Sequence, residues 1–137
     1  MRRLIEKHRL TLVQFAKFAV IGGTAFILDN ILVYFAIYAL GVDPTLAGFL
    51  SFPFVVTYTW IGNRLFTFRD APQSPKHIQW AKFAALCAIG LVFNRGTYVF
   101  AISTLPVSPY TPALSLALGT AVGMFFNFFG SKKLVFR

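Results

Sequence analysis

Apolar residues dominate four stretches of the chain, residues 18–40, 44–62, 83–105 and 112–130. A helix needs about 20 mostly apolar residues to cross the hydrocarbon core of a bilayer, and each stretch has roughly that length. The second and fourth stretches contain no Asp, Glu, Lys or Arg, whereas the first contains only Asp29 and the third only Arg95. The pattern therefore predicts an all-α membrane protein with four transmembrane helices.

Polar segments separate the predicted spans. Residues 41–43 form a tight connection, and residues 106–111, with two prolines, connect the last two spans. The longer segment 63–82 also contains two prolines and is expected to be a polar loop. The first apolar run is too long for a signal peptide, so we expect it to be a retained span.

Basic residues set the expected orientation. Of the 13 Lys and Arg residues, all but Arg95 lie before the first span, in segment 63–82 or after the last span. Because cytoplasmic segments of membrane proteins are enriched in Lys and Arg, both termini and the middle segment are predicted to be cytoplasmic. The net charge of +9 does not indicate a nucleic-acid partner, because the basic residues cluster between apolar runs.

The composition agrees with a membrane protein. Hydrophobic residues make up 57% of the chain and charged residues 12%, whereas about a quarter of the residues of a soluble domain are charged. Lipid must therefore solvate much of the surface. The single cysteine, Cys87, excludes an intrachain disulfide.

Two related segments divide what we expect to be a single membrane domain, residues 1–137. The matching pairs are residues 14–19 with 79–84, offset by 65, and residues 62–69 with 130–137, offset by 68. The repeats, about 14–69 and about 79–137, each hold two spans, so they should share one orientation. Parallel repeats of this kind are related by an axis along the membrane normal, and transporters often place a substrate site between them.

The order of short motifs along the chain resembles the GtrA-like family. A Lys-Phe pair opens the first span, two glycines follow, an Asp lies mid-span, and a basic-aromatic run follows the second span. The second half repeats much of this order. The residues concerned are Lys17-Phe18, Gly22-Gly23, Asp29 and 63–68, then Lys82-Phe83, Gly90, Asn94, Asn127-Phe128 and 131–136. The likeness covers about residues 14–137, although Cys87 and Ala88 stand where a second glycine pair would be.

The resemblance implies a multi-pass protein of the bacterial cytoplasmic (inner) membrane. Members of that family are implicated in moving or handling polyprenyl-phosphate-linked monosaccharides during cell-surface polysaccharide synthesis or modification. They commonly work beside a polyprenyl-phosphate glycosyltransferase. The resemblance leaves open whether the protein flips the lipid itself or assists an enzyme.

Four polar residues are expected near the middle of the bilayer: Asp29, Asn30, Asn94 and Arg95. Asp29 and Arg95 lie about 17 and 18 Å along their helices, in a core about 30 Å thick. A charge at that depth costs roughly 2.5–3.5 kcal/mol on insertion scales and needs a partner or water. We therefore expect one polar cluster, which serves either as a path for a sugar or phosphate head group or as an ion pair that docks the halves.

Basic residues are expected at the cytoplasmic ends of the spans, where an anionic lipid phosphate could gather: Lys17, Arg64, Lys82, Lys132 and Lys133. The alternative is that they anchor the protein at the interface, as in many membrane proteins. A stripe of small residues in the fourth span, Ser115, Gly119, Gly123 and Asn127, predicts close helix packing. Dimerisation through this stripe is the alternative.

Catalysis is not expected. His8 and His77 are far apart in the sequence, no residues have metal-ligand spacing, and the few carboxylates form no acid–base pair. No cofactor or metal is implied. The leading hypothesis is a flippase for a polyprenyl-phosphate-linked monosaccharide. The alternatives are a non-transporting subunit that anchors a glycosyltransferase, or a small multidrug-exporter-like proton antiporter that uses Asp29.

Overall fold

The protein is all-helical over the residues that the computed structural model describes, residues 2–72 and 74–137, with side chains from residue 5 onward. Its helices in order are α1 (Arg2–Leu40), α2 (Pro44–Gly62), η1 (Asn63–Thr67), α3 (Lys76–Thr104), α4 (Thr111–Gly130) and η2 (Ser131–Val135). The four α-helices are long and apolar enough to cross a membrane. The prediction of an all-α protein with four candidate membrane spans is therefore confirmed.

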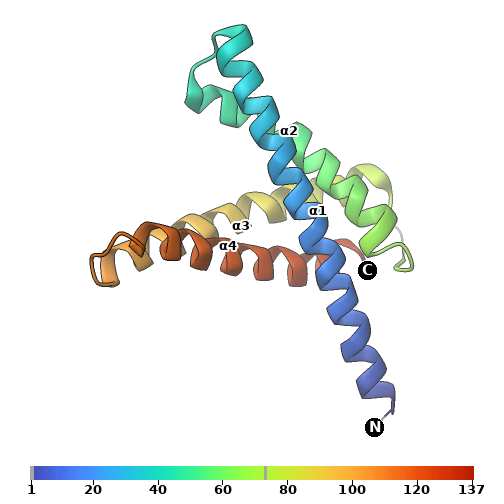
Figure 1. Ribbon diagram of the computed structural model, residues 1–137. Coiled ribbons are helices and arrows are strands. Elements are labelled where there is room, and N and C mark those ends of the chain that lie inside the picture. Colours follow the sequence, from blue (N-terminus) through green and yellow to red (C-terminus); the bar gives the residue numbers. More distant parts are fainter. Residues whose placement is uncertain (1, 73) are drawn as a thin grey trace. The chain divides into compact units, whose positions relative to one another are not determined.

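The helices form two hairpins (Figure 1). Unit 1, Met1–Gln73, contains α1, α2 and η1, and unit 2, Ser74–Arg137, contains α3, α4 and η2. Within unit 1, α1 packs against α2 and η1, and within unit 2, α3 packs against α4 and η2. Each unit is thus an antiparallel helix pair that ends in a short π-helical turn.

Helix α1 is longer than its apolar stretch. It has 39 residues, which correspond to about 58 Å, roughly twice the thickness of the hydrocarbon core. The polar residues before the first span therefore continue the same helix. Hydropathy identifies the part of a helix that suits lipid and leaves the end of the helix undetermined.

The segment 63–82 differs from the expected loop. Its first five residues form η1 and its last seven belong to α3, so only residues 68–75 connect the units. The prediction of a loop over the whole segment was wrong. In η1 the Phe68 N–H donates to the Asn63 carbonyl oxygen at 2.8 Å, five residues back. The Phe136 N–H makes the corresponding 2.9 Å bond to Ser131 in η2.

Each π-helical turn brings an aromatic ring back onto the first helix of its unit. The Phe68 ring meets Phe18 of α1 edge-on, with 6.5 Å between ring centroids and 63° between planes. Phe136 meets Phe83 of α3 in the same way, at 6.1 Å and 64°. All four rings are buried. These contacts close the end of each hairpin opposite its tight connection.

The connection between α1 and α2 is short because Gly41 adopts a left-handed conformation, with φ of +67°. A side chain at that position would strain the backbone. Asp43 then caps α2, since its Oδ1 accepts hydrogen bonds from the Thr45 and Leu46 N–H groups at 2.9 and 3.3 Å. Pro44 occupies the first turn, where its missing N–H costs nothing.

Small residues let α3 and α4 approach closely. A Cβ at Gly119 would lie 2.5 Å from the Asn94 carbonyl oxygen, and one at Gly123 would lie 3.0 Å from the Asn94 Cβ. Asn127 lies against Gly90, where a Cβ would be 2.0 Å from its Oδ1. The stripe of small residues predicted in the fourth span therefore faces α3 within unit 2.

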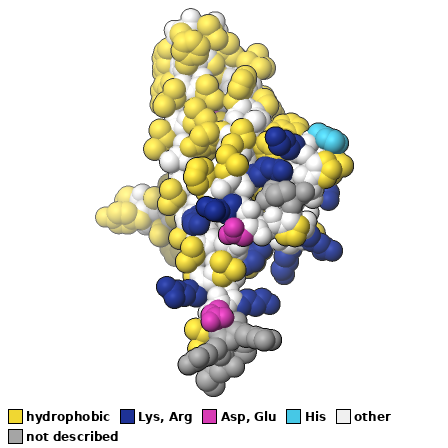
Figure 2. All heavy atoms as spheres, turned by 90° about the vertical axis from the view of Figure 1, so that its right-hand side faces the viewer, with side chains coloured by type: hydrophobic (Ala, Val, Ile, Leu, Met, Phe, Trp, Pro, Cys, Tyr) yellow, Lys and Arg dark blue, Asp and Glu magenta, His cyan; other side chains and the backbone are white. Residues whose placement is uncertain are grey.

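Unit 1 packs less closely along its length. A Cβ on Gly22, Gly23 or Gly48 would find no atom within 4 Å, although one on Gly62 would contact Ile21. Large apolar side chains also face outward, as at Phe49, which is 74% exposed. Figure 2 shows a surface of apolar side chains at the end of unit 1 that holds the α1–α2 connection. Such a surface is suited to lipid.

The contrast between the two units predicts opposite effects of the same substitution. Gly119→Ala should destabilise the protein by about 1–3 kcal/mol, because the new methyl group collides with the α3 backbone. Gly48→Ala should be neutral or stabilising, since alanine favours a helix by roughly 1 kcal/mol over glycine. Thermal unfolding of the purified variants in detergent measures both. Equal midpoints would contradict the close α3–α4 contact.

Candidate functional site

Asp29 has a hydrogen-bond partner on the neighbouring helix. The Ser51 hydroxyl of α2 donates to Asp29 Oδ1 at 2.6 Å, a short distance typical of a bond to a carboxylate. Asp29 is half-buried and Ser51 is 4% exposed. A carboxylate offers about four acceptor sites, so it can accept further hydroxyl or amide donors beside Ser51.

A second polar contact between the same two helices joins two hydroxyl groups. The Tyr58 hydroxyl donates to Thr24 Oγ1 at 3.0 Å, and Thr24 donates to the Ile21 carbonyl oxygen at 2.9 Å. Both side chains of the pair are exposed, Tyr58 by 41%. These hydroxyls can reorient toward a ligand without disturbing the backbone.

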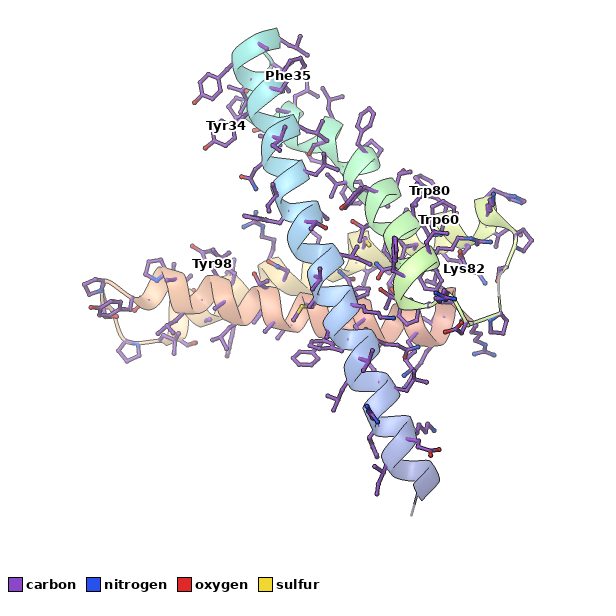
Figure 3. All side chains as sticks on the ribbon, turned by 45° about the vertical axis from the view of Figure 1, so that its right-hand side comes forward. Tyr34, Phe35, Trp60, Trp80, Lys82 and Tyr98 are labelled. Carbon is purple, nitrogen blue, oxygen red and sulfur yellow. The ribbon has the colours of Figure 1, made fainter. Side chains whose placement is uncertain are left out.

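Lys17 connects α1 to the π-helical turn of its own unit. Its Nζ donates to the Phe66 carbonyl oxygen at 3.4 Å, a long bond. The Arg64 guanidinium lies 5.7 Å from the ring centroid of Trp60, a cation–π distance. Trp60 lies near the end of α2 (Figure 3). Two cations are therefore held at this end of unit 1.

The corresponding cations of unit 2 lie on α3 and η2. Lys132 Nζ lies 6.0 Å from the ring centroid of Phe128, while Lys82 and Lys133 are exposed. Lys82 is in the second turn of α3 (Figure 3). Each unit thus carries basic side chains at the end where its π-helical turn lies.

Asn30 and Asn94 bond or pack within their own units. Asn30 Nδ2 donates to the Phe26 carbonyl oxygen of the same helix at 2.8 Å. Asn94 is half-buried, at the place where Gly119 and Gly123 approach α3. Arg95, one residue along, is exposed on α3 and lies in an open, mostly apolar hollow with Leu91 and Val99. Figure 3 shows Tyr98 on the same helix.

The structure brings together some of the predicted site residues. Lys17 contacts η1, the turn that carries Arg64. Asp29 belongs to unit 1 and Arg95 to unit 2. The shared polar cluster of these two residues stays a prediction.

The polar site predicted from the sequence did not include Ser51, Thr24 or Tyr58. Their spacing carries a usable signal, because two antiparallel helices joined by three residues pair positions whose numbers have a nearly constant sum. Asp29 with Ser51 and Thr24 with Tyr58 satisfy that relation. A single polar residue in an apolar run can be recognised as part of a polar site only when the residue opposite it on the neighbouring helix is also considered.

A metal centre finds no support in the part of the chain that the structure describes. There, no group of three or more His, Cys, Asp or Glu side chains lies close enough to hold an ion.

Comparison with known families agrees with the motifs. No curated protein matches the chain. The family model described as GtrA/DPMS, transmembrane domain, matches residues 17–136, nearly the whole length. The predicted resemblance is confirmed. The chain, with its four apolar helices, belongs to the GtrA/DPMS transmembrane domain family.

Proposed function

We propose that the protein moves a polyprenyl-phosphate-linked monosaccharide across the bacterial cytoplasmic membrane for cell-surface polysaccharide synthesis or modification. The family is linked in general to polyprenyl-linked sugar translocation and cell-surface glycosylation. One observation carries the proposal for this chain. A carboxyl group far along an apolar helix, bonded to a serine of its neighbour, offers acceptors for sugar hydroxyls where lipid offers none.

The lipid phosphate would be held at the cytoplasmic end of the units by five basic residues: Lys17, Arg64, Lys82, Lys132 and Lys133. A guanidinium can bind phosphate oxygens with two parallel hydrogen bonds, and an ammonium attracts them as a point charge. The head group would then pass Asp29, Asn30, Asn94 and Arg95, while the prenyl chain stays in lipid. The exposed apolar surface of the helices suits that arrangement.

Corresponding contacts support a two-fold repeat of parallel orientation. The Phe18–Phe68 and Phe83–Phe136 pairs are related by the offsets seen in the sequence. So are the cation–π contacts of Arg64 and Lys132. Two inverted units would place their basic ends on opposite sides of the membrane, against the positive-inside rule.

A non-transporting role is the second candidate. The basic start of α1 is helical and precedes the apolar stretch at residues 18–40. A rigid extension of that kind could hold a polyprenyl-phosphate glycosyltransferase close to the membrane. A protein that only anchors an enzyme would fail to move the lipid when reconstituted alone, so transport in liposomes of the purified protein distinguishes the two roles.

Topology is tested by cysteine labelling in a Cys87→Ser background. Asp70→Cys and Arg137→Cys should react with a membrane-impermeant maleimide only when the cytoplasmic side is open, because basic segments remain inside. Ser108→Cys, in the connection between α3 and α4, should react in intact cells. Labelling of Asp70→Cys and Ser108→Cys from the same side would contradict a four-span topology.

A double variant separates a site for the head group from a structural ion pair. If Asp29 and Arg95 only neutralise each other, Asp29→Asn with Arg95→Gln should restore activity that either single change removes. We expect instead a folded double variant with at least about tenfold lower activity, since hydrogen bonds to charged groups contribute about 1.5–3 kcal/mol.

The measurement is complementation of a deletion strain, with surface glycosylation normalised to the amount of protein in the membrane. Tyr34→Phe, a neutral change on the same helix as Asp29, is the control and should keep full activity (Figure 3). Full activity in the double variant would show that the two charges have only a structural role.

A further inference from the structure

Three contacts join α1 to α2 and η1 in unit 1, and we call them the polar ladder. They are Lys17 with the Phe66 carbonyl oxygen at 3.4 Å, Thr24 with Tyr58 at 3.0 Å, and Asp29 with Ser51 at 2.6 Å. From Lys17 to Asp29 the ladder rises about 18 Å along α1. It therefore leads from the basic end of the unit to the depth at which Asp29 lies.

Unit 2 has the same register but lacks the three hydroxyl groups. At an offset of 65 on α3 and 68 on α4, Thr24 with Tyr58 corresponds to Ile89 with Phe126, and Asp29 with Ser51 to Asn94 with Gly119. Phe126 packs on the Phe93 ring with 4.6 Å between centroids. At the other step Gly119 lies against the Asn94 backbone. The residues of unit 2 that correspond to Thr24, Tyr58 and Ser51 therefore bear no hydroxyl groups and serve helix packing.

We propose that the polar ladder of unit 1 is the binding path for the hydroxyl groups of the sugar, with Ser51, Thr24 and Tyr58 as binding residues beside Asp29. In unit 2 the corresponding helix contact is closely packed and carries no hydroxyl groups. This inference rests on the proposed function and locates the sugar-binding residues in unit 1.

The chemistry of the ladder suits a polyol. Hydroxyls both donate and accept, and the Asp29 carboxyl group accepts, so together they match the alternating groups of a sugar ring. Thr24 and Tyr58 are exposed, so a ligand can reach them from outside the hairpin. A prenyl chain, which has no polar atoms, gains nothing from these groups.

A purely structural role makes a different prediction. Hydrogen bonds between membrane helices contribute to stability, so in a structural role the ladder would only hold α1 to α2. In that case its removal would weaken binding of every lipid equally, through loss of structure. A binding role changes the preference for lipids that carry a sugar.

The experiment measures dissociation constants of the purified protein in nanodiscs for two kinds of lipid. One is a prenyl phosphate, and the other is the same lipid carrying glucose, mannose or galactose. The wild type should bind at least one sugar-bearing lipid more tightly than the bare phosphate. Ser51→Ala and Tyr58→Phe should each reduce that preference about fivefold, the factor that corresponds to a net hydrogen-bond contribution of about 1 kcal/mol.

Matched variants of unit 2 serve as controls. Tyr98→Phe removes the same hydroxyl as Tyr58→Phe, and Ser103→Ala removes a hydroxyl that bonds within α3 to the Val99 carbonyl oxygen at 2.7 Å. Both should keep the wild-type preference. Thr24→Ile with Tyr58→Phe gives unit 1 the residues of unit 2 and should abolish most of the preference while the bare phosphate still binds.

Three results would overturn the inference: a wild type without preference for any of the sugars, ladder variants that keep the preference, or unit 2 controls that lose it equally. Flipping in liposomes tests the proposed function separately. A protein that prefers the sugar through the ladder yet moves no lipid would refute transport and uphold the ladder. A protein that flips lipid with an unaltered preference in the ladder variants would do the reverse.

Discussion

Hydrocarbon leaves a polar group with no partner except those that the protein supplies, and this constraint governs the whole molecule. It makes every span a helix, because only a helix satisfies the backbone within one segment. It also makes each polar side chain in a span noteworthy. Asp29 accepts a hydrogen bond from Ser51, and Thr24 accepts one from Tyr58. Asn30 donates to a backbone carbonyl of its own helix.

The same constraint explains how helices pack without a hydrophobic driving force. Lipid tails are as apolar as leucine, so helices gain most where their backbones approach closely or where polar groups meet. Unit 2 uses the first solution at Gly119 and Gly123. Unit 1 adds the second through its polar ladder. The two hairpins are thus stabilised by different physical means.

Much of the fold was predictable because it follows from composition. Apolar runs of the right length predicted the four candidate spans. Helix ends were harder to predict, because residues 2–17 and 76–82 carry most of the charged residues of their helices and yet are helical. Hydropathy measures the fit to lipid, whereas helix continuation outside lipid also depends on residue propensities and on caps at the helix ends.

The site was predictable in part for a similar reason. Asp29 and Arg95 stand out because charge is rare in an apolar run. Thr24 and Tyr58 do not, since threonine and tyrosine are common in membrane helices and gain significance only through a neighbour. Which residues of two helices face each other depends on how the helices are aligned, and the sequence of one helix alone does not show this.

The close contacts of Gly119 and Gly123 also bear on how the chain can change over evolutionary time. A position that touches the backbone of a neighbouring helix accepts almost no larger residue. Positions along α1 and α2 whose glycines face open space accept many. Sequence variation should therefore accumulate unevenly, slowly along the α3–α4 contact and faster in unit 1. One hairpin can in this way vary in sequence while the other keeps its close helix contact.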